Sequence, residues 1–132
     1  MSEGNGYADR ATFLAPAQRR FKDVWLPVGG HKLRLQSLME GEKEAYESSM
    51  LNSKSGGLRM DRVKRARREL ISRCLVKQDG TLLLGTEDVD ALMKLDGADM
   101  AFLQEECQTF CGFKQGDIEG LVKNSEAAHV SD

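Results

Sequence analysis

The sequence predicts a mainly helical α+β protein, in which a small N-terminal β-hairpin packs on a bundle of about four helices. Apolar and polar residues alternate over 32–38, which is typical of a strand with one wet face. In 60–76 and again in 102–111, apolar residues recur at three- and four-residue steps, which indicates helices with one buried face. The 132 residues suffice for one modest core.

The chain divides into three parts. Residues 1–20 mix polar residues with few apolar ones, so we expect a flexible N-terminal arm. Residues 21–113 contain the strongly patterned segments and are predicted to form a single α-rich globular domain that begins with the hairpin. Residues 114–132 form a polar C-terminal tail with room for one short helix.

The hairpin is predicted around Gly29 and Gly30, which lie between the apolar segment 24–28 and the alternating segment 31–38. Both glycines accept the positive φ angles that tight hairpin turns require. Pro27 cannot donate a ladder hydrogen bond, because it lacks an N–H group. Its strand is therefore expected at a sheet edge, or interrupted at the proline.

Two helices are predicted between the hairpin and residue 76. Residues 39–52 are rich in helix formers and acidic at the start, and their narrow apolar face comprises Ala45, Tyr46 and Met50. Residues 60–76 give the strongest helical pattern and are expected at the centre of the core, through Met60, Val63, Ala66, Leu70, Ile71, Cys74 and Leu75.

Two more helices are predicted before residue 113, after an apolar run at 82–84 that is either extended or a buried corner. Thr86 is placed as the N-cap of the first, whose expected apolar face is Val89, Leu92, Met93 and Leu95. The second follows Asp96-Gly97 and places Phe102, Leu103, Cys107, Phe110 and Cys111 on one side. Gly112 and Phe113 are typical of a glycine cap closed by an apolar residue.

No arrangement of residues indicates catalysis or a cofactor. His31 and His129 lack a neighbouring ligand at a helical metal-binding spacing. Cys107 and Cys111 would supply two of four zinc ligands, but the sequence offers no second pair. Together with Cys74 they fall in apolar stripes, which favours reduced thiols packed as small hydrophobes. We therefore expect no enzyme activity, no metal and no cofactor.

The overall charge and hydropathy indicate a protein of the cytoplasm. The net charge is −2, from 19 basic and 21 acidic residues, so the molecule as a whole has little electrostatic reason to bind nucleic acid or an anionic membrane. We find no apolar stretch long enough to span a bilayer, and the N-terminus lacks the layout of a signal peptide.

Basic residues cluster in 59–73, where seven arginines and lysines face only Asp61 and Glu69, a local charge of 7 − 2 = +5. Three interpretations are open: a nucleic-acid surface, a solvated face partly paired with the acidic segment 40–47, or an arginine-rich surface for a protein partner. The segment lacks interleaved aromatic residues and a known DNA-binding motif, which favours the last two.

The order of segments carries a further signal. Leu38, Glu42, Tyr46 and Glu47 fit a helix pattern L-x-x-x-E-x-x-x-(Y/F)-E after the extended pair. A basic amphipathic helix at 68–76 then leads to Asp79-Gly80, an acidic helix start at 86–89, the cap at 112–113 and the ending 123–127. In this order the chain resembles, over about residues 21–127, the tail assembly chaperones of long, non-contractile-tailed bacteriophages and related prophages.

The resemblance implies a role in tail morphogenesis rather than in the finished virion. Chaperones of this family bind the aggregation-prone tape measure protein in several copies, keep it soluble in the host cytoplasm and leave as the tail tube forms. In many relatives a frameshifted longer form recruits tail tube protein. The implied partners here are therefore the tape measure protein, tail tube protein through such a longer form, and other copies of the chain.

Trp25, Arg62, Arg65 and Arg68 are the candidate partner contacts, and Trp25 is equally compatible with a place in the core. Two alternatives to the chaperone remain open at this point. One is a small nucleic-acid-binding regulator that uses the basic segment 59–73, and the other is a minor structural protein of the virion.

Overall fold

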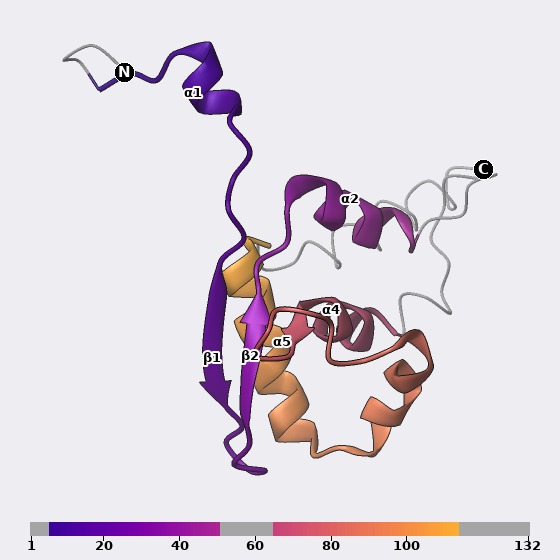
Figure 1. The fold of residues 1–132 in the computed structure, drawn as a ribbon. Coiled ribbons are helices and arrows are strands. Elements are labelled where there is room, and N and C mark those ends of the chain that lie inside the picture. Colours follow the sequence, from indigo (N-terminus) through magenta and orange to yellow (C-terminus); the bar gives the residue numbers. More distant parts are fainter. Residues whose placement is uncertain (1–5, 51–64, 114–132) are drawn as a thin grey trace, which may run out of the picture.

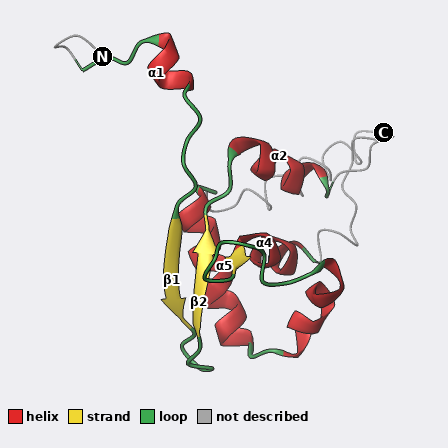
Figure 2. Cartoon of the chain, in the orientation of Figure 1, coloured by secondary structure: helices red, strands yellow, loops and turns green. Residues whose placement is uncertain are grey.

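The structure is a computed structural model that describes residues 6–50 and 65–113. A three-stranded antiparallel sheet, in the order β1-β2-β3, lies on one side of the domain, and helices α4 and α5 and the 3₁₀ helix η1 form the other side (Figures 1 and 2). The predicted α+β class, mainly α, is confirmed. The sheet contains one strand more than the predicted hairpin.

The hairpin comprises β1 (Phe21–Trp25) and β2 (Lys32–Gln36). Its turn is closed by the N–H of Leu26, which donates to the carbonyl of His31 at 2.9 Å. Gly30 adopts a positive φ of 76°, whereas Gly29 does not. Pro27 follows the end of β1, and β1 is an edge strand, as its missing N–H predicted.

The two faces of the hairpin differ because side chains alternate along a strand. Val24 and Leu35 are buried, and Lys22 on the same face forms an ion pair with Glu106 of α5 (Gly97–Cys111) at 2.8 Å. This face therefore packs on α5, which runs behind β1 and β2 in Figure 1. The opposite face, which we call the outer sheet face, carries Phe21, Asp23, Trp25, Lys32 and Arg34.

Helix α5 is capped at both ends, at the C-terminus by the glycine that the sequence indicated and at the N-terminus by Asp96, which was expected only to precede the helix. The carboxylate of Asp96 accepts hydrogen bonds from the N–H groups of Ala98 and Asp99 at 2.9 and 3.3 Å. Gly112 adopts a left-handed conformation, and the N–H of Phe113 donates to the carbonyl of Gln108 at 2.8 Å. The predicted glycine cap is thus confirmed.

Helix α4 spans Ala66–Cys74, so the prediction of a helix to residue 76 is wrong at its end, and residues 60–64 lie outside the described part. Leu75–Val76 instead forms β3, which pairs with Leu35 and Arg34 of β2. In a longer helix the backbone N–H and C=O groups of residues 75–76 would form hydrogen bonds within the helix. Here they form hydrogen bonds in the sheet instead. The run at 82–84 is partly extended, because Leu82 bridges to Val76.

The segment 86–94 forms η1 (Thr86–Lys94), which is a 3₁₀ helix. Its N-cap is Gly85 rather than the predicted Thr86, and the carboxylate of Asp88 accepts from the Gly85 N–H at 2.8 Å. Val89 and Leu92 are buried, but Met93 and Leu95 are 68% and 52% exposed, against prediction. With three residues per turn, positions 89 and 92 share one face that 93 leaves. Leu95 lies beyond the end of the helix, as its extended C-cap.

Helix α2 (Glu40–Ser48) covers the end of the domain beside α4, within the predicted segment 39–52. Tyr46 is buried and its hydroxyl donates to the carbonyl of Ala66 at 2.9 Å, while its ring meets that of Phe113 edge-on at 5.6 Å. Met50 is also buried, but Ala45 is exposed, so its predicted place on the apolar face is wrong. The helix turns only a narrow strip toward the core.

The hydrophobic core lies where α4, α5 and the sheet meet. Its most deeply buried side chains come from β2, α4 and α5 and from the residue that follows the C-cap of α2: Leu35, Met50, Leu70, Ile71, Cys74, Leu103 and Cys107. In the described part of the chain, no helix is both long and apolar enough to cross a membrane.

The N-terminal arm contains a short helix, α1 (Arg10–Leu14), that buries none of its residues. Phe13 and Leu14 are 78% and 57% exposed, and Figure 1 shows α1 standing away from the domain on an extended segment. The base of the arm is held firmly, because Arg19 donates two hydrogen bonds to the Glu42 carboxylate, both at 2.9 Å. The predicted tail, 114–132, lies outside the described residues.

Candidate partner-binding surfaces

The hairpin tip is held on α5 by one buried carboxylate. Asp99, in the first turn of α5, is 5% exposed and accepts hydrogen bonds from the N–H groups of Val28 and Gly29 at 2.8 and 2.9 Å. A side chain at position 29 would crowd it, because a Cβ there would lie 3.1 Å from the Asp99 Oδ2 atom. Asp99 therefore fixes the position of the hairpin, and with it the position of Trp25.

Trp25 lies on the outer sheet face and is 59% exposed, so the structure places it at the surface rather than in the core. The ammonium group of Lys32 lies 5.2 Å from the centre of its ring, close enough for a cation–π interaction. At the other end of β1, Phe21 is 48% exposed. Two aromatic side chains are thus presented on the same face of the same strand.

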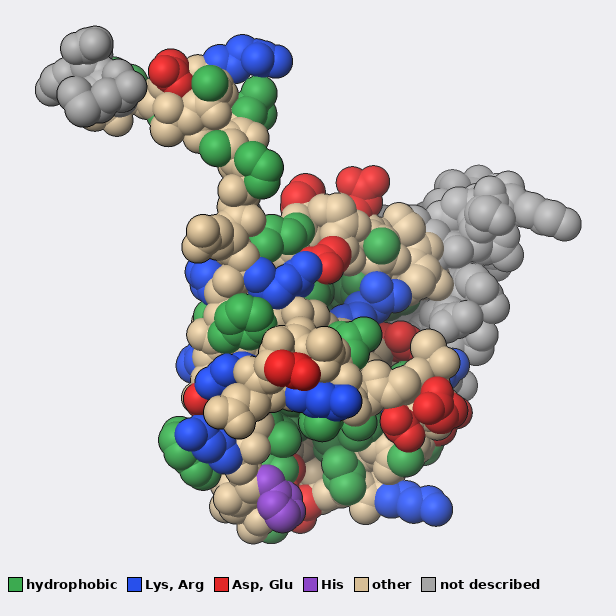
Figure 3. All heavy atoms as spheres, in the orientation of Figure 1, with side chains coloured by type: hydrophobic (Ala, Val, Ile, Leu, Met, Phe, Trp, Pro, Cys, Tyr) green, Lys and Arg blue, Asp and Glu red, His purple; other side chains and the backbone are tan. Residues whose placement is uncertain are grey.

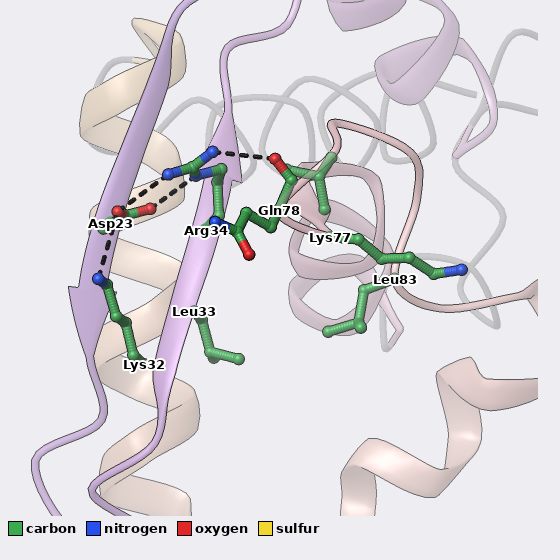
Figure 4. A pocket seen from close by; sticks show the side chains of 8 residues that line it. Asp23, Lys32, Leu33, Arg34, Lys77, Gln78 and Leu83 are labelled. Carbon is green, nitrogen blue, oxygen red and sulfur yellow. Dashed lines mark hydrogen bonds and ion pairs between the residues drawn. The ribbon is translucent and has the colours of Figure 1, made fainter.

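Asp23, between the two aromatic residues, is held within the sheet. Arg34 donates two hydrogen bonds to its carboxylate at 2.8 and 3.1 Å, and a third to the carbonyl of Gln78 at 3.0 Å (Figure 4). The hydrogen bonds from Arg34 hold the pKa of Asp23 below its ordinary value. The carboxylate is therefore ionised at neutral pH, with its charge compensated inside the sheet.

A shallow hollow of about 360 Å³ opens beside this pair, at the end of β3. Figure 4 shows Leu33 and Leu83 on its walls and the ammonium groups of Lys32 and Lys77 directed to either side. Its charged residues are three basic and one acidic, and it is lined by Asp23, Lys32, Leu33, Arg34, Val76, Lys77, Gln78 and Leu83. The hollow suits an apolar group of a ligand or partner that has a negatively charged group next to it.

The arginines predicted as partner contacts are distributed differently. Arg62 lies outside the described residues. Arg65 and Arg68 are 29% and 18% exposed at their side chains and approach the Asp90 carboxylate of η1 at 3.3 and 3.8 Å. Arg65 and Arg68 thus face η1, whereas Glu42 of the acidic segment 40–47 binds Arg19. The hydrogen bond from Arg19 and, after it, the charge of Arg73 on α4 help to hold the pKa of the Glu42 carboxyl below its ordinary value.

Charge is unevenly spread over the face drawn in Figure 3. Basic side chains lie along the strand side and in the middle of this face, and acidic side chains are most prominent over α2 and near η1, where a basic side chain also lies. Sequence reasoning identified Trp25 but missed Phe21, Asp23 and Arg34, which meet only when β1 and β2 pair. The signal available in the sequence was the alternation of side chains along 21–25 and along 32–36, which places these residues on one face once the two strands pair.

The three cysteines are reduced and buried, as predicted. The Sγ atoms of Cys74 and Cys111 lie 3.5 Å apart, and no group of three potential metal ligands occurs among residues 6–50 and 65–113. The pKa of Cys111 is raised, first by hydrogen bonding with the Cys74 thiol and then by burial. The pKa of Cys74 is also raised, chiefly by hydrogen bonding with the Cys107 thiol.

These thiols are expected to resist modification until the protein unfolds. Only the thiolate attacks a disulfide reagent. Burial shields all three thiols, and the raised pKa of Cys74 and of Cys111 lowers the thiolate fraction of those two. At pH 8 the native chain should react with an aromatic disulfide reagent about 100-fold more slowly than the chain in denaturant. Absorbance of the released thiolate measures the rate, and rapid reaction of one native thiol would contradict the buried cluster.

Comparisons with known proteins bear on the fold. No protein-family model and no curated protein matches the chain. A solved structure of the tail assembly chaperone of bacteriophage HK97 matches with a TM-score of 0.50 and 17% sequence identity, over 70% of this chain and 85% of that one. The chain shares its fold with a phage tail assembly chaperone. The resemblance predicted from the order of segments is thereby confirmed in three dimensions.

Proposed function

We propose that this protein is a tail assembly chaperone that binds the tape measure protein of a long-tailed bacteriophage and keeps it soluble during tail morphogenesis. The shared fold with the HK97 tail assembly chaperone carries the proposal. The protein acts in the host cytoplasm, in several copies, and is absent from the mature tail. Tail tube protein is a further partner, reached through a longer, frameshifted form of the chain.

The physical task of such a chaperone is to cover apolar stripes on a long helical protein until the tube encloses them. Exposed stripes associate with one another unless another surface covers them. The outer sheet face supports this role, because Trp25 and Phe21 supply exposed aromatic area beside the basic groups of Lys32 and Arg34. A helix with an apolar stripe and acidic flanks is the complementary partner.

Of the four candidate contacts, Trp25 is the one that presents most of its side chain to solvent in the described structure. Arg65 and Arg68 are partly engaged by Asp90, so we propose that they contact the partner from the rim of the surface. Arg62 stays a candidate on its charge alone. The engagement with Asp90 also lowers the charge that α4 can offer to phosphates, which favours a protein partner.

Co-expression with the tape measure protein encoded by the same phage tests the proposal. The wild-type chain should move that protein into the soluble fraction and co-purify with it. Trp25→Ala should lower the amount of soluble complex severalfold, because interface tryptophans commonly dominate binding. Met93→Ala is the matched control, since Met93 is 68% exposed and lies on η1, away from the strands.

Two results would refute the proposal. One is a tape measure protein that precipitates equally with and without the wild-type chain. The other is the chain itself in purified, mature particles at stoichiometric amounts, which would make it a structural protein of the virion. Retention of nucleic acid at low salt that is lost steeply as salt rises would instead support the regulator.

A further inference from the structure

The backbone of β1 has an unpaired outer edge. Two flanking hydrogen bonds fix which residues face β2: the N–H of Leu26 donates to His31 at 2.9 Å, and the N–H of Ser37 donates to Arg20 at 2.8 Å. Because the pattern alternates along an antiparallel pair, the backbone groups of Phe21, Asp23 and Trp25 point away from β2. No described residue hydrogen-bonds to these outward groups.

The charges that commonly guard an edge strand are turned away from this edge. Lysine and other charged side chains on an edge normally discourage another strand from pairing. Here Lys22 is held over the helical face by Glu106 at 2.8 Å, and Asp23 is held over β2 by Arg34 at 2.8 Å. Phe21 and Trp25 remain exposed at the two ends of the strand. The edge is thus unpaired, apolar at both ends and open to a further strand.

We infer that β1 pairs antiparallel with β1 of a second copy, about a two-fold axis at Asp23, so that two sheets join into one. The strand is self-complementary in this register. Outward groups at 21, 23 and 25 meet outward groups at 25, 23 and 21 of the second copy, which satisfies the hydrogen-bonding alternation. Phe21 then lies opposite Trp25 of the second copy, and such aromatic cross-strand pairs stabilise a sheet.

The two Asp23 carboxylates would meet at the axis, and their charges are balanced there. Each Asp23 carries its own Arg34, with a nitrogen–oxygen distance of 2.8 Å, and Lys32 at 3.8 Å. Two carboxylates would therefore be accompanied by four cationic groups. The pairing also brings the outer sheet faces of the two copies side by side, which doubles the aromatic and basic surface.

The N-terminal arm gives a second reason for an antiparallel pair of copies. The arm leaves the domain at the start of β1, and α1 exposes Phe13 and Leu14 with no described residue of its own domain beneath them. In the two-fold arrangement, the start of one β1 lies beside the end of the other. Each arm would then extend past the hairpin tip of the second copy, where Val28 is 62% exposed.

Light scattering coupled to gel filtration of the purified chain tests the pairing. The wild type should elute with twice the chain mass of 14.7 kDa. Asp23→Pro should be monomeric, because it removes an outward N–H while every ladder bond to β2 is kept. Asp23→Ala is the matched control: it loses the same ion pair with Arg34 but keeps the N–H, and it should remain dimeric.

A crosslinking experiment checks the register without relying on the proline variant. In Asp23→Cys the new thiols meet at the axis, with Cα atoms about 5.5 Å apart, so a short bis-maleimide should give a covalent dimer. Val28→Cys should not crosslink, because the two residues 28 would lie roughly 30 Å apart at about 3.3 Å per residue. The native thiols are buried and do not compete.

A monomeric wild type at tens of micromolar, a dimer that survives Asp23→Pro, or crosslinking at 28 but not at 23 would each overturn the inference. The experiments use the purified chain alone, so they are independent of the proposed partner. A monomeric chain that still solubilises the tape measure protein would refute the pairing and not the chaperone. A dimeric chain that fails to solubilise the tape measure protein would refute the chaperone and not the pairing.

Discussion

Replacing Ile71 by alanine is expected to lower the free energy of unfolding by about 2–5 kcal/mol. Ile71 lies in the middle of α4, is 0% exposed and belongs to the core that α4, α5 and the sheet share. Removing three carbon atoms there loses their transfer from water and leaves a cavity that the neighbours refill only partly. Because domains of this size are stable by roughly 5–15 kcal/mol, the variant should approach unfolding at 37 °C.

Urea denaturation followed by circular dichroism, at one fixed protein concentration, measures the change. Ile71→Val should cost only about 0.5–1.5 kcal/mol, since it removes one methyl group. Met93→Ala should change the free energy of unfolding by less than about 0.5 kcal/mol, because Met93 is largely exposed. Equal effects of Ile71→Ala and Met93→Ala would contradict the core described here.

Replacing Asp99 by alanine is expected to lower the free energy of unfolding by about 2 kcal/mol, the second largest effect. The carboxylate is nearly buried and holds the N–H groups of Val28 and Gly29 in two charge-assisted hydrogen bonds. It also places a negative charge in the first turn of α5, where the helix dipole favours one. Alanine's higher helix propensity offsets only about 0.5 kcal/mol of the loss.

Asp99→Asn separates the contributions to this effect. The amide keeps one acceptor oxygen but no charge, so about half of the loss should remain. Hydrogen exchange of the amides of Val28 and Gly29 should accelerate in Asp99→Ala, while Glu105→Ala, exposed on the same helix, should leave both unchanged. If exchange at the tip were unaltered in Asp99→Ala, the carboxylate would not be what holds the hairpin on α5.

Local patterns were sufficient for the parts of the fold that depend on neighbours in the sequence. The hairpin was predicted from the alternation in 32–38 and from Gly29-Gly30, and the cap of α5 from Gly112-Phe113. Both rest on backbone preferences and side-chain periods that act within a few residues. The burial of Leu70, Ile71 and Cys74 followed from the same period.

Other features depended on contacts between distant segments. The end of α4 could not be predicted, because residues 75–76 remain compatible with a helix until β2 offers them a strand partner. The prediction of the apolar face of η1 was wrong in part. Helices with 3.0 and with 3.6 residues per turn both place positions 89 and 92 on one side, but only the helix with 3.6 residues per turn also brings 93 there. Asp99 lies 70 residues from Gly29 along the chain, so no local pattern joins them.

The sequence by itself determined the fold class, the single core with its reduced thiols, and the order of segments that resembles a tail assembly chaperone. Only the tertiary structure decided that Trp25 is exposed, that Arg65 and Arg68 face Asp90, and that β1 has an unpaired outer edge. The physical reason is the range of the interactions. Periodicity fixes which side of an element is apolar, whereas exposure and charge pairing depend on which elements pack against it.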